Sequence, residues 1–190
     1  MYVKVCGITR PKDAESAVAA GADAIGVVLF TDSPRSVTPR RAEAILKAVS
    51  GEVETVCVTM TRSPADLGTI FGLSPDAIQI YHDLTIPDRF IRISGWDGRS
   101  PLPEGADRLL LDASHGRGIP LNIDDAKAAV MKTELPVVLS GGLTPSSVGD
   151  LIRSVRPAGV DVSSGVEIRP GLKAPHHMQA FIGACKGEYL

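Results

Sequence analysis

The feature that most constrains the fold is a regular alternation of short apolar runs with amphipathic helical segments along the whole chain. Eight runs are rich in Val, Ile and Leu, and most are continuous rather than alternating with polar residues. Such runs are typical of strands that are buried on both faces of a parallel sheet. We expect these strands at Val3–Cys6, Ala24–Leu29, Thr55–Thr59, Ala77–Ile80, Phe90–Ile93, Arg108–Asp112, Pro136–Ser140 and Val160–Val162.

The segments between these runs carry apolar residues at helical spacing. Stripes at i, i+3, i+4 and i+7 run from Ala42 to Val49 and from Val148 to Val155, and shorter ones occupy Ala14–Val18, Leu67–Phe71 and Ala126–Val130. Proline is favoured in the first turn of a helix, where its missing N–H group has no partner to lose. We therefore expect helices to begin at Pro39, Pro64 and Pro145.

Eight strands, each followed by a helix or a short substitute, predict a compact parallel (β/α)8 barrel, the TIM-barrel fold, in a single domain spanning residues 1–190. A doubly wound open sheet is the alternative, although it more often has five or six strands. The chain is short for a barrel, whose usual lower limit is about 200 residues. Asp83–Arg89 and Ser94–Asp107 are rich in Pro and Gly, so we expect shortened helices or loops after strands four and five.

Charge and cysteine content exclude several classes of function. A net charge of −2 and the lack of a basic block argue against nucleic-acid binding. No apolar run approaches the ~20 residues that a membrane-spanning helix needs, and the N-terminus has no secretory pattern. Cys6, Cys57 and Cys185 are widely spaced and odd in number, which fits neither a disulfide framework nor a metal site. We expect a cytoplasmic protein with reduced thiols, either a monomer or a homodimer.

Polar residues stand where three of the predicted strands end, and in a (β/α)8 barrel the active site forms at these carboxyl ends. Cys6 ends the first strand, Gln79 lies near the end of the fourth, and Asp112 ends the sixth. Strands seven and eight lie between six and one in the ring, so Cys6 and Asp112 should face each other across the mouth. This geometry suits general acid–base catalysis. The alternative for Cys6 is core packing, because buried cysteines are usually inert.

Two loops rich in glycine and serine follow the last two predicted strands. Gly141 and Gly142 follow strand seven, and Ser163, Ser164 and Gly165 follow strand eight. These loops form the usual phosphate site of this fold, because glycine lets the backbone approach the anion and serine hydroxyls add donors. A single Gly-Gly turn is weak evidence, but two such loops in these positions predict a phosphorylated small-molecule ligand.

Two further loop residues are candidates for ligand contact. Arg35 follows Ser33-Pro34 in the loop after the second predicted strand. A lone loop arginine is commonly a solvated charge, but at a barrel mouth its planar fork suits a substrate carboxylate. His115, three residues after Asp112, is either a mouth residue or a solvated one.

Five motifs carry a family resemblance over nearly the whole chain. KVCGIT, SPRSV, LLLDAS, LSGGLTPSSV and GVDVSSGVEIRPGLK occur in this order between residues 4 and 173. Together they resemble the phosphoribosylanthranilate isomerase family of tryptophan biosynthesis. The resemblance implies an Amadori rearrangement of a phosphoribosyl anthranilate that needs neither a cofactor nor a metal. The substrate that the resemblance implies is a small sugar phosphate.

The resemblance also assigns roles to individual residues. Asp112 would protonate the furanose ring oxygen and open the ring to an iminium, and Cys6 would then remove the proton at C2 of the sugar. The resulting enolamine tautomerises to the ketone. Arg35 would hold the anthranilate carboxylate, and Gln79 is expected to contact the substrate.

The chain departs from the family pattern in two places. The fourth strand reads QIYHD, with Tyr81 and His82, where the family usually has Gln-Leu-His-Gly. After Asp112 the chain reads SHGRGIP, with Arg117 in place of the usual Gly-Gly-Thr-Gly stretch. These changes bear on substrate contacts more than on the reaction.

Two rival functions remain open. One is a related sugar-phosphate isomerase of histidine synthesis, but those enzymes typically use two aspartates and Cys6 argues against that assignment. The other is a catalytically silent protein that keeps the phosphate loops. The presence of both Cys6 and Asp112 weighs against it.

Overall fold

Eight parallel strands close into a barrel in the computed structural model, which describes residues 1–112 and 121–187. The strands pair in chain order, and the eighth pairs with the first. Their bounds are β1 Tyr2–Val5, β2 Ala24–Leu29, β3 Glu54–Thr59, β4 Ala77–Ile80, β5 Ile91–Trp96, β6 Arg108–Leu111, β7 Val137–Ser140 and β8 Gly159–Val162. The predicted (β/α)8 barrel is confirmed, and the open sheet is wrong.

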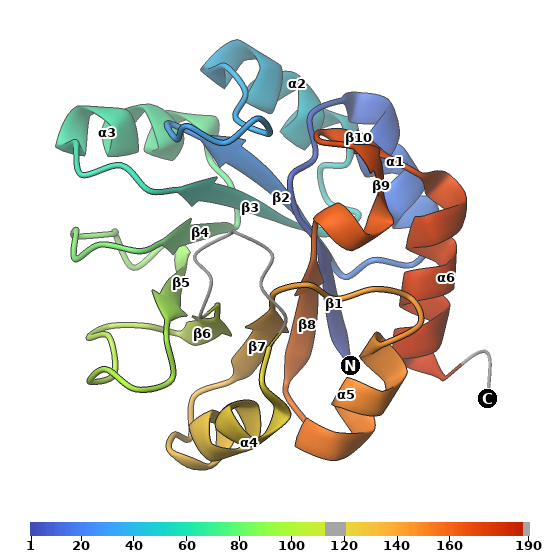
Figure 1. Cartoon of the computed structure of the whole chain (residues 1–190). Helices are drawn as coiled ribbons and strands as arrows, with labels where there is room; N and C mark the ends of the chain where they lie inside the picture. Colours follow the sequence, from blue (N-terminus) through green and yellow to red (C-terminus); the bar gives the residue numbers. More distant parts are fainter. Residues whose placement is uncertain (113–120, 188–190) are drawn as a thin grey trace.

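Helices lie around the outside of the barrel (Figure 1). They are α1 Pro11–Ala19, α2 Pro39–Ala48, α3 Pro64–Leu73, α4 Ile123–Met131, α5 Val148–Val155 and α6 Pro175–Lys186. Between β8 and α6 lie one 3-10 turn, η1 Ser164–Val166, and an antiparallel hairpin of β9 Glu167–Arg169 and β10 Leu172–Lys173. Residues 81–90 and 97–107, all of them described, connect β4 to β5 and β5 to β6 without a helix, as predicted. No helix in the described part of the chain is long and apolar enough to cross a membrane.

The fifth strand differs most from the prediction. It spans Ile91–Trp96, whereas the sequence pattern ends it at Ile93. Gly95 reads as a loop residue, yet it pairs with Leu110 of β6, and a Cβ atom on it would overlap the ring of Tyr81. The glycine therefore makes room for a side chain and does not mark a loop. The other strand ends lie within one residue of the predicted ones.

Two of the three predicted proline starts are confirmed. Pro39 and Pro64 are the first residues of α2 and α3. Pro145 is not a helix start, because α5 begins only at Val148. The carbonyl oxygen of Thr144 accepts the N–H of Val148 at 3.1 Å, so the proline lies in a turn that precedes the helix.

The hydrophobic core has two layers. The outer layer packs the helices against the barrel and contains Cys57 and Cys185. The inner layer fills the barrel and consists of Cys6, Ala24, Val28, Val56, Val58, Ala77, Ile93, Leu110 and Val138. Burial raises the pKa of the Cys57 and Cys185 thiols to about 12, so both are inert packing residues. Cys6 is the cysteine of the inner layer.

Candidate active site

A cavity of about 860 Å³ opens at the end of the barrel where the strands finish. Seven of the eight strands, or the loops that follow them, supply residues to it. Eight of the nine predicted site residues line it, namely Cys6, Arg35, Gln79, Asp112, Gly141, Gly142, Ser163 and Ser164. The structure thus brings the predicted acid–base pair and the predicted phosphate loops together around one cavity. Gly165 is the residue that does not line it.

Cys6 directly follows β1 and is 9 % exposed. Its N–H donates to the carbonyl oxygen of Val162 in β8 at 2.8 Å, which fixes its position on the barrel. Its thiol lies against Gly26, where an added Cβ atom would come within 2.9 Å of Sγ. Burial raises the pKa of the Cys6 thiol, and the nearby ammonium group of Lys4 opposes that shift. The thiol is suited to act as a base once it is deprotonated.

Gly7 explains why a glycine follows the cysteine. Its φ angle is +73°, and a Cβ atom there would lie 2.5 Å from Cδ of Arg35 and 2.8 Å from Oγ of Ser163. A residue with a side chain would be strained in this conformation and would displace Arg35. The glycine therefore lets Arg35 lie across the end of β1, next to Ser163.

Asp112 directly follows β6 and is 3 % exposed. Its N–H donates to the carbonyl oxygen of Trp96 at 3.1 Å. Because β7 and β8 separate β6 from β1, Asp112 and Cys6 reach the cavity from different sides of the barrel. A substrate between them can receive a proton from one group and lose a proton to the other.

A polar network fills the barrel interior beneath these two residues. The ammonium group of Lys4 donates to Oε1 of Gln79 at 2.7 Å and to Oδ2 of Asp161 at 2.9 Å. Since Lys4 can only donate, the carbonyl of the Gln79 amide must face it. Nε2 of Gln79 then donates to the Tyr81 hydroxyl at 2.9 Å. Gln79 lines the cavity, as predicted, and its side chain is hydrogen-bonded to both Lys4 and Tyr81.

One carboxylate oxygen of Asp161 is available to accept a hydrogen bond from a ligand. The residue is 5 % exposed and lines the cavity, yet Oδ1 has no hydrogen-bond partner among the residues that the structure describes. A buried acceptor without a donor is costly, so such atoms often mark a ligand position. Burial raises the pKa of Asp161, although the Lys4 ammonium beside it acts in the opposite direction. The oxygen is placed to accept a hydrogen bond from a bound hydroxyl group.

The two predicted phosphate loops meet at the mouth. Gly141 and Gly142 have φ angles of +107° and +63°, which residues with side chains rarely adopt. Gly165 lies so close to the carbonyl oxygen of Leu143 that a Cβ atom would overlap it. Its role is therefore to let the loop after β8 approach the loop after β7. Close backbone approach of this kind suits an anion held by N–H groups.

Arg35 lines the cavity, but its guanidinium group already has a partner. Nε donates to Oε1 of Glu167 at 2.9 Å, and Nη2 donates to Oε2 at 2.7 Å. The Arg35 side chain is 18 % exposed and Glu167 is 4 % exposed. The arginine is thus a fixed group at the wall of the cavity rather than a solvated loop charge.

Apolar side chains line the cavity on the side of β2 and β3. They are Val28, Phe30, Val58 and Met60, and Leu143 lines it on the side of β7. An apolar wall opposite a few convergent polar groups is typical of a small-molecule site. This wall suits an aromatic ring, because a planar apolar face finds no competing polar partner there.

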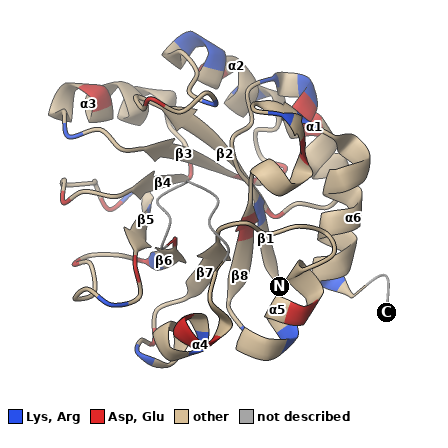
Figure 2. Ribbon diagram, in the orientation of Figure 1, with Lys and Arg blue, Asp and Glu red and all other residues tan. Residues whose placement is uncertain are grey.

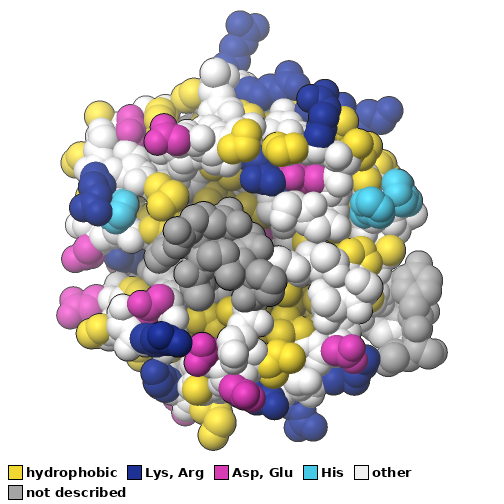
Figure 3. Space-filling model, in the orientation of Figure 1, with side chains coloured by type: hydrophobic (Ala, Val, Ile, Leu, Met, Phe, Trp, Pro, Cys, Tyr) yellow, Lys and Arg dark blue, Asp and Glu magenta, His cyan; other side chains and the backbone are white. Residues whose placement is uncertain are grey.

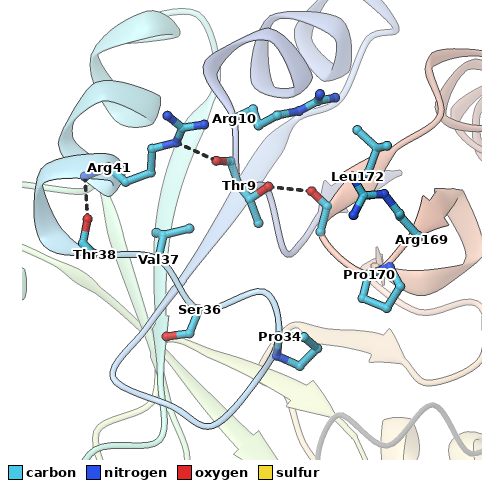
Figure 4. A pocket seen from close by; sticks show the side chains of 11 residues that line it. Thr9, Arg10, Pro34, Ser36, Val37, Thr38, Arg41, Arg169, Pro170 and Leu172 are labelled. Atoms are coloured by element: carbon cyan, nitrogen blue, oxygen red, sulfur yellow. Dashed lines mark hydrogen bonds between the residues drawn. The ribbon is translucent and has the colours of Figure 1, made fainter.

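A second depression of about 530 Å³ lies outside the mouth, between the loops before α1 and α2 and the β9–β10 hairpin (Figure 4). Arg10, Arg41 and Arg169 line it. Basic residues are frequent on α1 and α2 (Figure 2), and basic side chains gather on the same part of the surface (Figure 3). Nε of Arg41 donates to the carbonyl oxygen of Thr9 at 2.9 Å, and Arg10 pairs with Asp13. None of its lining residues is a carboxylate or a thiol. It therefore offers no acid–base pair, and the barrel mouth is the candidate active site.

Four charged residues in the cavity wall or directly behind it were not predicted from the sequence. Lys4, Asp161, Glu167 and Lys173 are all buried and charged. A signal existed for the first two, because β1 reads Val-Lys-Val and β8 reads Val-Asp-Val, and opposite charges within two apolar strands suggest a pair. His115 and Arg117 lie outside the described residues. In residues 1–112 and 121–187 no group of three or more His, Cys, Asp or Glu side chains is arranged to hold a metal ion.

Comparison with known proteins identifies the family. The model of N-(5'phosphoribosyl)anthranilate (PRA) isomerase matches residues 101–184. The N-(5'-phosphoribosyl)anthranilate isomerase of Methanoregula boonei is 42 % identical over 191 residues, which cover 98 % of this chain and 97 % of that protein.

Solved structures agree with the sequence comparison. Phosphoribosyl anthranilate isomerase from Thermus thermophilus is similar with a TM-score of 0.88 and 29 % identity, covering 99 % of this chain and 100 % of that one. A phosphoribosyl anthranilate isomerase in complex with reduced 1-(o-carboxyphenylamino)-1-deoxyribulose 5-phosphate has a TM-score of 0.75 and 29 % identity, covering 98 % and 99 %. The predicted resemblance is confirmed, and the chain belongs to the N-(5'-phosphoribosyl)anthranilate isomerase family.

Proposed function

We propose that this chain catalyses the Amadori rearrangement of N-(5'-phosphoribosyl)anthranilate to 1-(2-carboxyphenylamino)-1-deoxyribulose 5-phosphate, with Asp112 as the acid and Cys6 as the base. The observation that carries the proposal is that both groups line one cavity from different sides of the barrel, with the glycine- and serine-rich loops after β7 and β8 between them. The reaction needs no redox partner, because it moves protons within one molecule.

Asp112 and Cys6 divide the proton transfers between them. Asp112 gives its proton to the furanose ring oxygen, the C1–O bond breaks, and the nitrogen lone pair forms the iminium. The Cys6 thiolate then takes the proton from C2, and the C–H electron pair neutralises the iminium to give the enolamine. The positive charge of the iminium stabilises the thiolate beside it. Tautomerisation of the enolamine gives the ketone.

The other cavity residues bind the two ends of the substrate. Gly141, Gly142, Ser163 and Ser164 line the side where backbone N–H groups and hydroxyls suit the phosphate. On the Arg35 side we place the anthranilate carboxylate, with the aromatic ring on the apolar wall. Such a split between polar ends and an apolar middle matches the charge distribution of the substrate.

Inner residues of the cavity have supporting roles in this proposal. The open oxygen of Asp161 accepts a hydrogen bond from a sugar hydroxyl. Gln79 has an amide hydrogen beyond the one it gives to Tyr81, and we assign that hydrogen to the substrate.

A fluorescence assay that follows loss of the anthranilate substrate tests the proposal. The wild-type protein should turn it over without an added cofactor or metal ion. Turnover of the aldose substrate of histidine synthesis instead would favour the related isomerase. Phosphate binding without turnover of either substrate would identify a silent phosphate-binding protein.

A single domain of residues 1–190, a cytoplasmic location and a monomeric or homodimeric state complete the proposal. Light scattering on the purified protein separates the two oligomeric states.

A further inference from the structure

A cluster of charged groups lies behind the wall of the cavity at Arg35. Glu167 belongs to β9 and Lys173 to β10, and the two are cross-strand neighbours in the hairpin. The Lys173 ammonium lies 3.0 Å from Oε1 of Glu167, and its side chain is fully buried. Neither residue lines the cavity. Any effect they have on a bound substrate must therefore pass through another residue.

Glu167 is saturated with hydrogen bonds. Oε1 accepts from Nε of Arg35 at 2.9 Å, from Nζ of Lys173 at 3.0 Å and from the N–H of Gly171 at 3.1 Å. Oε2 accepts from Nη2 of Arg35 at 2.7 Å. Burial acts to raise the pKa of Glu167, but the hydrogen bonds and charges of Arg35 and Lys173 outweigh it, and the pKa lies below its usual value. The carboxylate is fixed and ionised.

This pairing orients Arg35 and leaves some of its N–H donors available to a ligand. A guanidinium group has five N–H donors in a planar fork. Glu167 takes the edge formed by Nε and Nη2, which leaves the edge formed by Nη1 and Nη2 for a second planar anion. Arg35 lines the cavity, and we assign this remaining edge to a substrate carboxylate.

Lys173 connects the same cluster to the phosphate loop. Its ammonium donates to the carbonyl oxygen of Ser163 at 3.1 Å and lies 3.5 Å from Oγ of the same residue. Ser163 is a cavity residue at the end of β8. One buried ion pair therefore holds both the arginine on one side and the serine loop on the other.

The hairpin that carries the pair is itself anchored. The Thr9 hydroxyl donates to the carbonyl oxygen of Gly171 at 2.5 Å (Figure 4), and the N–H of Lys173 donates to Asp13 of α1 at 3.4 Å. The ion pair is thus part of a rigid frame and not a flexible surface contact.

We infer that Glu167 and Lys173 are positioning residues that hold Arg35 and the Ser163 loop at a fixed separation, so that the site selects substrates carrying both a carboxylate and a phosphate. The inference rests on the proposed function, which supplies a substrate with these two anions. Glu167 sets the carboxylate end through Arg35. Lys173 sets the phosphate end through Ser163.

The test compares Glu167→Gln with the wild type in kinetics and in binding. The amide places an N–H₂ group against a guanidinium donor, so Arg35 loses its orientation. We expect KM to rise about tenfold, the order expected when a buried charged hydrogen-bond partner is lost. We expect kcat to change less than about threefold, because no group in the proton transfers is altered. Affinity for inorganic phosphate, measured by calorimetry, should stay within about twofold.

A double-mutant cycle with Arg35→Ala separates positioning from a general structural effect. If Glu167 acts through Arg35, Glu167→Gln adds nothing once Arg35 is gone. Additive effects of the two changes would overturn the inference. Glu54→Gln is the matched control, because Glu54 forms a similar double hydrogen bond with Arg108, at 2.8 and 3.2 Å, at the opposite end of the barrel. It should leave KM unchanged.

A second variant covers the case in which Glu167→Gln does not fold because Lys173 is left buried without a counter-charge. Glu167→Gln/Lys173→Met replaces the pair by neutral groups. We expect this variant to show the same rise in KM and, in addition, weaker binding of inorganic phosphate, because the Ser163 tether is lost. Unchanged KM and unchanged phosphate affinity in a folded double variant would overturn the inference.

Binding of the reduced product 1-(o-carboxyphenylamino)-1-deoxyribulose 5-phosphate distinguishes the two proposals. An inactive wild type that binds this compound, and loses about tenfold in affinity with Glu167→Gln, would contradict the proposed function alone. An active wild type whose kinetics and binding are both insensitive to Glu167→Gln would contradict only the positioning role.

Discussion

Two buried lysine–carboxylate pairs in the described part of the chain differ in whether the carboxylate has an oxygen atom without a hydrogen-bond partner. Lys4 and Asp161 lie inside the barrel, and one oxygen of Asp161 has no hydrogen-bond partner in the described part of the chain. Lys173 and Glu167 lie behind the wall, and both oxygens of Glu167 are occupied. We expect the incomplete pair, which faces the cavity, to bind a ligand, and the completed pair to support the wall in front of it.

The pKa directions agree with this contrast. Burial raises the pKa of Asp161, and Lys4 only partly offsets the effect. At Glu167 burial also acts upward, but Arg35 and Lys173 together bring the pKa below its usual value. The cost of the incomplete pair is offset when a ligand supplies the missing donor. The comparison therefore predicts different kinetic consequences for changes at the two pairs.

The largest effect is expected at Cys6, which lies next to the incomplete pair. Cys6→Ser keeps the size of the side chain but supplies a far weaker base, so kcat should fall at least about 10²-fold, the usual scale of positioned acid–base catalysis. Cys57→Ser is the control, because that thiol is buried in the outer layer and does not line the cavity. Steady-state kinetics on both variants measure the difference. Near-full activity of Cys6→Ser would mean that the thiol only packs.

A smaller effect is expected at Asp161. Asp161→Asn halves its acceptor capacity and leaves Lys4 without a counter-charge, so kcat/KM should fall about tenfold or more and the free energy of unfolding should decrease by about 1–3 kcal/mol. In contrast to Glu167→Gln, part of the loss should appear in kcat. Kinetics together with chemical denaturation measure both quantities. If only KM changes, the contrast between the two pairs disappears.

The pH dependence tests the electrostatic side of the comparison. Because burial raises the pKa of Cys6, kcat/KM should still be rising with pH at the ordinary pKa of a thiol, about 8.5. Lys4→Met removes the charge that lowers this pKa, so the rise should move to higher pH. Iodoacetamide alkylation of Cys6 against pH, with Cys57 as the buried reference, reports the same shift. A shift to lower pH would contradict the account.

The smallest effect is expected in the outer depression. Arg169 lies on β9, two residues from Glu167, but lines the depression and not the cavity. Arg169→Ala should leave kcat/KM within about twofold of the wild type, since exposed charges contribute little to a site they do not touch. Progress curves at low substrate concentration provide the measurement. A large loss would extend the functional surface beyond the mouth.

The fold and the positions of the candidate acid and base at the cavity are predictable from the sequence because both leave local signals. Apolar runs and helical stripes fix the alternation of elements, and Cys6 and Asp112 stand where runs end. The length of β5 is not predictable in this way, because Gly95 has a packing role that depends on Tyr81.

Supporting groups are harder to predict because their partners are distant. Lys4 and Asp161 are separated by 157 positions and meet only when β8 closes against β1. Arg35 and Glu167 are separated by 132 positions. From the sequence, Arg35 is a candidate for a substrate carboxylate, but nothing local shows that a buried glutamate already holds one of its edges.

The most direct test of the central claim is the turnover of N-(5'-phosphoribosyl)anthranilate by Asp112→Asn, followed by loss of substrate fluorescence. The asparagine keeps the shape of the side chain and removes the proton donor, so kcat should fall at least about 10²-fold relative to the wild type. Affinity for inorganic phosphate should be retained, because the loops after β7 and β8 are unchanged. An Asp112→Asn protein that turns over the substrate at close to the wild-type rate would contradict the account.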